Sequence, residues 1–237
     1  FRESLKQRLD ILNAEKKHLD PLIEILKGKI SPSFVRNEEF FKENRDNLYI
    51  ISNGFKEFIV PIVQELGIRE ENVFANTFRF DKQDKIVGFD TSNVLSSNGG
   101  KVATLKTLDL KGDVYMIGDG YTDYEVKAAG LANKFYAFTE NIERDSVLKK
   151  ADHITPSMDE FLYLFKMNKA ISYPKNRIKV LLLENVHPDA LGLMKSEGYN
   201  VSTYSGAMDE EELAERIKDV SVLGIRSKTQ LTKKVLD

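Results

Sequence analysis

The chain has 237 residues, of which 41% are hydrophobic and 30% charged, and its formal net charge is −2. This length suits one full domain plus part of another. The even charge balance excludes a basic surface for nucleic acid or for anionic lipid. The absence of cysteine excludes disulfides, thiolate zinc sites and a cysteine nucleophile, and the three histidines do not lie at the spacing of a transition-metal site.

No apolar run approaches the roughly 18–20 residues of a membrane helix, and the first residues do not form a signal peptide. We therefore expect a cytoplasmic protein without a membrane partner. There is no initiator methionine, and the last residues stop inside an expected helix. We expect both ends to be cut.

The first two thirds of the chain alternate between helical and strand patterns after a helical start. Leucines at helical spacing predict a helical region over residues 1–45. A strand at 48–51 follows, and then a helix to Gly67 in which Pro61 should cause a kink or an early end. The further expected elements are strands at 73–80 and 86–89, a helix from Val102, a strand at 114–117, a helix to Ala129 and a strand at 135–138. This alternation predicts a Rossmann-like parallel sheet with helices on both faces.

A polar stretch containing Pro174 predicts a linker over 169–177. Beyond it the expected elements are strands at 179–184, 200–204 and 222–225, helices at 187–197 and 208–218, and a last helix from about Gln230. The predicted organisation is an α/β protein: a partial helical cap (1–45), a core (46–168), a linker (169–177) and the start of a second, flavodoxin-like α/β domain (178–237).

The segment from Val114 to Asp123 is the most informative for chemistry. An apolar strand leads directly into Asp119, which has a glycine on each side, and Asp123 follows four residues later. Ligands of open α/β sheets bind beyond the carboxyl ends of the strands, and carboxylates with open water positions suit Mg²⁺. The alternative is an ordinary strand-to-helix turn in which Asp123 is a first-turn helix acid.

Two further segments could bind an anion. Ser52, Asn53 and Gly54 follow an apolar strand and are expected to open a helix, where a hydroxyl and free amides form an anion site; the alternative is a simple N-cap. Lys101 is expected to begin a helix, where the helix dipole disfavours a cation. It would therefore answer a nearby negative charge, or else be a solvated surface lysine.

Together these segments resemble motifs two, three and four of the haloacid dehalogenase superfamily, and most closely its phosphoserine phosphatases. The stretches from Phe1 to Arg8 and from Asn72 to Asn76 are also similar to that family, so the resemblance covers about residues 1–165. It implies that Asp119 binds Mg²⁺, that Asp123 supports the metal's water shell and the lysine, and that Lys101 neutralises the phosphoryl group and the nucleophile.

The resemblance further implies that Ser52 and the Gly54 backbone hold the phosphoryl group, and that Phe1 and Arg8 contact the substrate from the cap. A core Phe1 and a solvated Arg8 are the alternatives. Asn53 stands where the family usually has glycine, and Thr122 where it commonly has asparagine. Both departures bear on the choice of substrate.

The superfamily's nucleophile is the first aspartate of an Asp-x-Asp motif that ends a strand, and it forms an aspartyl-phosphate. No such motif follows an apolar strand in residues 1–165. We therefore expect the 237-residue chain to be inactive by itself.

The second predicted domain has its own resemblance. The segment from Ile178 to His187 looks like the first strand and turn of D-3-phosphoglycerate dehydrogenase, and the segment from Gly224 to Thr229 looks like that family's Arg-Ser loop. The resemblance implies that Arg226 and Ser227 contact a substrate phosphate or carboxylate; a plain polar loop is the alternative. No Gly-x-Gly-x-x-Gly is present, so NAD would belong to a part of the dehydrogenase outside these residues.

The expected function is hydrolysis of O-phosphoserine with Mg²⁺, fused to oxidation of 3-phosphoglycerate with NAD, both in serine biosynthesis. The expected partners are small phosphorylated metabolites, with no nucleic acid and no membrane, and a homo-oligomer is left open. The alternatives are a phosphatase for another small phosphate ester and a non-catalytic piece that binds phosphorylated metabolites.

Overall fold

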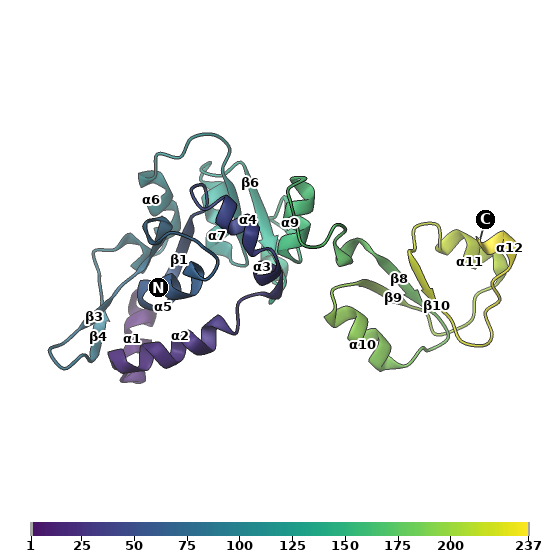
Figure 1. The fold of residues 1–237 in the computed structure, drawn as a ribbon, viewed down its shortest axis with the longest axis horizontal. Helices are drawn as coiled ribbons and strands as arrows, with labels where there is room; N and C mark the ends of the chain where they lie inside the picture. Colours follow the sequence, from purple (N-terminus) through teal and green to yellow (C-terminus); the bar gives the residue numbers. More distant parts are fainter. Residues whose placement is uncertain (1, 237) are drawn as a thin grey trace. The chain divides into compact units, whose positions relative to one another are not determined.

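A computed structural model describes residues 2–236, which form two compact units, one ending at Met158 and the other beginning at Asp159 (Figure 1). The predicted linker at 169–177 lies inside the second unit. There, Arg177 and Asn176 donate to the Glu160 carboxylate, with Arg177 Nη2 2.6 Å from Oε1. Each unit is an α/β structure, as predicted.

The first unit contains helices and strands in alternation after a helical start. Its elements are α1 (Arg2–Leu12), α2 (Leu19–Lys27), α3 (Pro32–Arg36), α4 (Glu38–Glu43), β1 (Ile50–Phe55), α5 (Lys56–Gln64), β2 (Val73–Asn76), β3 (Phe78–Phe80), β4 (Ile86–Phe89), α6 (Gly100–Thr107), β5 (Tyr115–Gly118), α7 (Tyr121–Ala128), β6 (Lys134–Phe138), α8 (Asp145–Leu148) and β7 (His153–Thr155), with short 3₁₀ turns at Lys16–His18, Glu70–Asn72 and Val94–Ser96. Helix α5 contains Pro61 and ends at Gln64, three residues before the predicted end at Gly67.

The parallel sheet of the first unit has two parts. Strand β1 pairs with β2, and β5, β6 and β7 pair in that order, all in parallel. No backbone ladder joins the two parts within residues 2–236. They nevertheless share a core, because Ile51 of β1 and Met116 of β5 pack against one cluster built around Leu105, Val126 and Ala132. The predicted parallel sheet with covering helices is confirmed, in two pieces.

A separate antiparallel hairpin packs with the first helix. Residues 73–80 divide at Thr77 into β2, which pairs with β1, and β3, which pairs with β4. Leu9 of α1 is buried against Ile86 and Phe89 of the hairpin and against Phe55, and Figure 1 shows α1 beside β3 and β4. Strands at 73–80 and 86–89 were predicted, but their antiparallel pairing and their packing against the helix at the start of the chain were not.

The end of the predicted helical region contacts the core sheet. The buried Ser33 of α3 donates its amide to Glu140 Oε1 at 2.9 Å, and its hydroxyl accepts from the amide of Met158 at 2.8 Å. The ring of Phe34 packs edge-on against Phe138 of β6. Helix α3 is therefore fixed to the carboxyl end of β6.

The second unit is a three-stranded parallel sheet with helices. Its elements are α9 (Met158–Leu164, across the unit boundary), a 3₁₀ turn (Lys175–Arg177), β8 (Lys179–Leu182), α10 (Pro188–Ser196), β9 (Asn200–Thr203), α11 (Glu210–Arg216), β10 (Val222–Gly224) and α12 (Lys233–Leu236). The strand order β10-β8-β9 places β8 in the centre. Leu181 and Leu183 pack with Leu213 of α11 and Val235 of α12, while α10 contacts β9 (Figure 1). No helix among residues 2–236 is long and apolar enough to span a membrane.

Candidate active site

The turn between β5 and α7 directs the Asp123 side chain back toward the strand. Its Oδ2 accepts a hydrogen bond from the amide of Gly120 at 3.0 Å. A Cβ atom at position 118 would lie 2.2 Å from the Asp123 carboxyl carbon. Gly118 is therefore required because a side chain there would collide with this carboxylate. Of the two glycines that flank Asp119, Gly118 gives the Asp123 side chain room and Gly120 donates a hydrogen bond to it.

Lys101, in the first turn of α6, forms an ion pair with Asp123. Its Nζ lies 2.5 Å from Asp123 Oδ1, and the two side chains are only 13% and 6% exposed. Desolvating two charges offsets much of their attraction, so a buried pair is weak evidence of a stabilising role. The predicted association of Lys101 with a carboxylate is present in the structure, and a Lys ammonium has further donors for a second anion.

Asp119 is held differently from Asp123. Arg144, in the loop before α8, donates to the Asp119 carboxylate and also to its backbone oxygen at 2.6 Å. Both side chains are close to half exposed. A cavity of about 390 Å³ adjoins Asp119 and is lined also by Phe34, Phe138 and Asn141.

The contacts of the two carboxylates bear on which of them could hold a metal ion. Among residues 2–236 there is no group of three or more acidic or histidine side chains that could hold a metal ion. The Asp119 carboxylate is engaged by Arg144, and that of Asp123 by Lys101 and an amide. Asp119 as a metal ligand therefore stays a prediction, and its carboxylate is engaged by Arg144 in this structure.

The prediction that Ser52, Asn53 and Gly54 open a helix is wrong. All three belong to β1, whose register shifts between Ile51 and Phe55, and α5 begins only at Lys56. The ladder with β2 continues to Phe55, which delays the helix. The amide of Gly54 donates to Ser52 Oγ at 3.0 Å, so this amide is used within the chain.

Asn53 has a structural role that the sequence did not suggest. The Asn53 side-chain Nδ2 donates to the backbone oxygen of Leu95 at 3.1 Å, and the backbone oxygen of Asn53 accepts a hydrogen bond from Asn76 Nδ2 at 2.9 Å. Asn76, fully buried at the end of β2, also reaches the Leu95 oxygen at 3.4 Å. The two asparagines thereby tie the Ser52 segment to the turn that precedes Lys101. A polar residue at a strand end was the signal that could have indicated Asn76.

Three further residues were predicted to contact the phosphatase substrate, namely Phe1, Arg8 and Thr122. Phe1 lies outside the described residues, so its predicted cap contact with substrate stays a prediction. Arg8 and Thr122 are exposed, the latter in the first turn of α7. Arg2, which sequence reasoning missed, donates to the oxygen of Thr91 at 2.8 Å and to Ser96 Oγ at 3.1 Å.

In the second unit, Arg226 and Ser227 lie just beyond the carboxyl end of β10, as predicted. Their side chains are exposed, and Arg226 Nη1 lies 3.4 Å from the backbone oxygen of Glu184. The amide of Ser227 donates to the Glu184 carboxylate at 2.8 Å. Glu184 is another residue that the sequence analysis did not single out.

Comparison with known proteins separates the same two units. Residues 180–237 match the family described as D-isomer specific 2-hydroxyacid dehydrogenase, catalytic domain. The D-3-phosphoglycerate dehydrogenase of Dictyostelium discoideum is 46% identical over 70 residues, which are 30% of this chain and 17% of that protein.

The larger part of the chain is similar to phosphatases. The chloroplastic phosphoserine phosphatase of Arabidopsis thaliana is 31% identical over 156 residues, covering 64% of this chain and 52% of that protein. The chain thus spans about half the length of this relative. The crystal structure of a phosphoserine phosphohydrolase-like protein from Francisella tularensis superposes with a TM-score of 0.57 at 30% identity, covering 69% of this chain and 76% of that one. The chain belongs to the phosphoserine phosphatase family and carries, at its C-terminal end, a segment homologous to D-3-phosphoglycerate dehydrogenase.

Proposed function

We propose that the protein hydrolyses O-phosphoserine and oxidises 3-phosphoglycerate, two reactions of serine biosynthesis, and that the chain supplies part of each site. The observation that carries the proposal is the nearly buried Lys101–Asp123 pair at the carboxyl end of β5. Ligands of parallel sheets bind at this edge, and a desolvated ammonium there favours a phosphate group.

In the proposed reaction, the chain's own residues neutralise and orient the phosphoryl group. Lys101 offsets charge on the phosphoryl oxygens, and Asp123 fixes the position of the ammonium through the 2.5 Å contact. Ser52, within β1, offers a hydroxyl donor. Positioning and charge neutralisation are most of what phosphoryl transfer requires of a protein.

Two components of the proposed reactions lie outside these residues. No Asp-x-Asp follows an apolar strand in residues 1–165, and NAD has no fingerprint loop here. We propose that the complete protein provides the nucleophile beside the edges of β1 and β5, and that it uses Mg²⁺, with Asp119 as one ligand, and NAD. Arg144 would then have to release the Asp119 carboxylate.

The test uses the natural full-length protein and measures phosphate release from O-phosphoserine. Lys101→Met should lower kcat/KM by about 10²–10³-fold, the usual cost of removing one group that stabilises transition-state charge. Lys106→Met is the matched control, because Lys106 is an exposed lysine of the same helix, and it should keep wild-type activity.

The outcomes separate the alternatives for the substrate. If the folded wild-type protein releases phosphate faster from another small ester than from O-phosphoserine, then the substrate is that ester, as the Asn53 and Thr122 departures allow. If it releases phosphate from neither, the hydrolase proposal fails and a phosphometabolite-binding role is favoured. Reduction of NAD in the presence of 3-phosphoglycerate, assayed in the same preparation, tests the second reaction independently.

A further inference from the structure

Glu184 follows the central strand of the second unit and is almost fully buried, with 7% of its surface exposed. Its carboxylate accepts hydrogen bonds from three consecutive backbone amides. Ser227 and Lys228 donate to Oε2 at 2.8 and 3.0 Å, and Thr229 donates to Oε1 at 2.7 Å. No phosphatase residue is involved, so the arrangement belongs to the second unit alone.

Three converging amides normally form an anion-binding concavity. Here that concavity is filled by a carboxylate of the chain itself. The hydroxyl of Thr229 and the amides of Lys228, Thr229 and Ser227 lower the pKa of Glu184 to about 2, so it is ionised at neutral pH. An external anion therefore cannot use these amides and meets the side chains instead.

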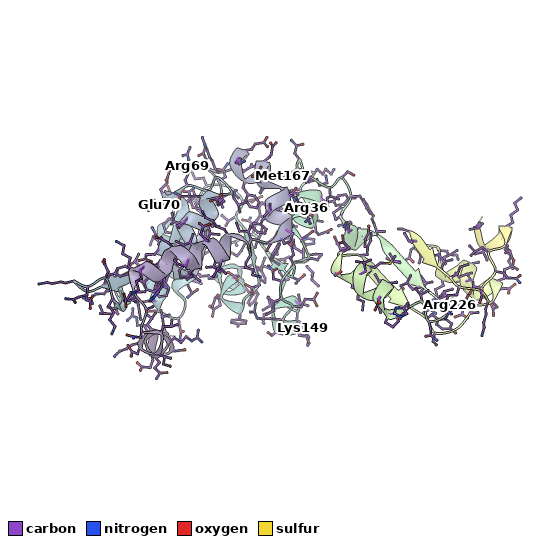
Figure 2. The ribbon with its side chains drawn as sticks, turned by 60° about the horizontal axis from the view of Figure 1, so that its bottom comes forward. Arg36, Arg69, Glu70, Lys149, Met167 and Arg226 are labelled. Carbon is purple, nitrogen blue, oxygen red and sulfur yellow. The ribbon has the colours of Figure 1, made fainter. Side chains whose placement is uncertain are left out.

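The side chains that remain available are those of Arg226, Ser227 and Lys228, which are all exposed, and Figure 2 shows Arg226 on the surface of the second unit. The Arg226 guanidinium is also close to the Glu184 backbone oxygen, at 3.4 Å. Glu184 thus contacts all four residues of the loop 226–229, three through its carboxylate and one through its carbonyl.

We infer that Glu184 is a positioning residue, whose carboxylate fixes the turn at 226–229 so that Arg226, Ser227 and Lys228 form a preset group of side-chain donors for a phosphate- or carboxylate-bearing ligand. This inference rests on the function proposed for the second unit. It adds a residue that does not touch the ligand, and it predicts recognition by side chains rather than by loop amides. A negative charge beside the loop would, by itself, weaken anion binding, so the two effects of Glu184 have opposite signs.

The first measurement is amide hydrogen exchange on the 237-residue chain at neutral pH. Glu184→Gln replaces one acceptor oxygen by an NH₂ group, which faces the donating amides. We expect exchange at residues 227–229 to accelerate by about tenfold or more. The bond from the Leu183 amide to the Gly224 oxygen, between β8 and β10, should keep its protection and thereby show that the sheet is intact.

Two matched variants separate position from charge. Glu197→Gln removes an equal charge from the same unit at an exposed site paired with Lys175, and it should leave the loop unchanged. Glu184→Asp keeps the charge but shortens the side chain by one methylene, and it should behave like Glu184→Gln. Wild-type exchange at 227–229 in Glu184→Gln would overturn the positioning role.

The second measurement uses the natural full-length protein and follows resonances of residues 226–228 during titration with D-3-phosphoglycerate. Positioning predicts weaker binding by Glu184→Gln than by wild type, whereas charge alone predicts tighter binding; tighter binding would overturn the inference. If the full-length wild-type protein shows no shifts at these residues while the exchange result holds, the proposed ligand class and the function proposed for the second unit fail. The role of Glu184 in fixing the loop would still stand.

Discussion

The two units each bury a carboxylate beyond a parallel strand, and they satisfy it in different ways. Asp123, after β5, is 4% exposed and binds the Lys101 ammonium and one backbone amide. Glu184, after β8, is 7% exposed and binds three backbone amides. The first partner is a charged side chain and the second is the backbone of a turn.

This difference determines what each carboxylate leaves available. A lysine ammonium has three donors and a flexible stem, so Lys101 can contact Asp123 and an incoming anion together. Each backbone amide has one donor, and those at 227–229 are used by Glu184. In the first unit the buried acid therefore keeps a cation near a possible ligand. In the second unit it fixes a loop in which the side chains of Arg226, Ser227 and Lys228 are exposed.

Removing the first carboxylate should have the largest effect on stability. Asp123→Ala leaves the Lys101 charge nearly buried without its partner, which typically costs about 3–5 kcal/mol. We expect the free energy of unfolding of the first unit to fall by that amount, measured by urea denaturation with amide signals of β5 and α7 as the probe.

Asp10→Ala is the control, because Asp10 is exposed in α1, and it should change the free energy of unfolding by less than about 0.5 kcal/mol. A loss of under about 1 kcal/mol for Asp123→Ala would mean that water reaches Lys101 and that the pair is effectively solvated.

The sequence predicted the acid and lysine of the first unit, but it did not single out Glu184 in the second. The dipole argument predicted that Lys101 lies near a negative charge, and the family resemblance placed it with Asp119 and Asp123 beyond a strand end. The family resemblance also assigned Asp123 as the acid that supports the lysine, and the structure pairs Lys101 with Asp123. That pairing depends on the backbone turn at Gly118, where a Cβ would collide with the Asp123 carboxyl.

Other features were not predictable because they depend on contacts between distant residues. Arg144 reaches Asp119 across 25 positions, and Ser227 reaches Glu184 across 43. The division of residues 73–80 into two sheets follows from pairing with β1 and β4, and local strand propensity does not encode it. Alternation of helix and strand correctly predicted the α/β class of both units, since this pattern is local.

Acid should weaken the second unit through Glu184. The pKa of Glu184 is about 2 in the folded chain, compared with an ordinary value of 4.5 for a glutamate in the unfolded chain. The unfolded state therefore binds more protons between these two pH values. The stabilising contribution is complete above pH 4.5 and is lost as the pH falls toward 2. Glu184→Gln should lack this component, so its free energy of unfolding should fall less steeply over that interval.

The pH dependence of the free energy of unfolding must be compared between wild type and Glu184→Gln, because other acidic residues of the same unit also contribute to it. Lysine partners lower the pKa of Glu197, Asp219 and Glu211 in the same unit, so the wild-type curve alone is not diagnostic. The free energy of unfolding of wild type and of Glu184→Gln is measured by urea denaturation at several pH values. If the two curves were parallel, the three amide hydrogen bonds to the Glu184 carboxylate would not stabilise the folded state.

The smallest effect is expected at the exposed pair in the first unit. Arg144 and Asp119 are 43% and 49% exposed, and ion pairs at such sites contribute about 0–1 kcal/mol. Arg144→Ala should therefore cost less than about 1 kcal/mol in urea denaturation, and added salt should reduce even this difference, because exposed charges are screened. Asp123→Ala should keep its full cost in the same salt, since the Lys101 charge is shielded from solvent ions. If Arg144→Ala instead cost as much as Asp123→Ala, burial would not be what distinguishes the two acids of this turn, and Asp119 would be a structural residue rather than one held reversibly at the candidate site.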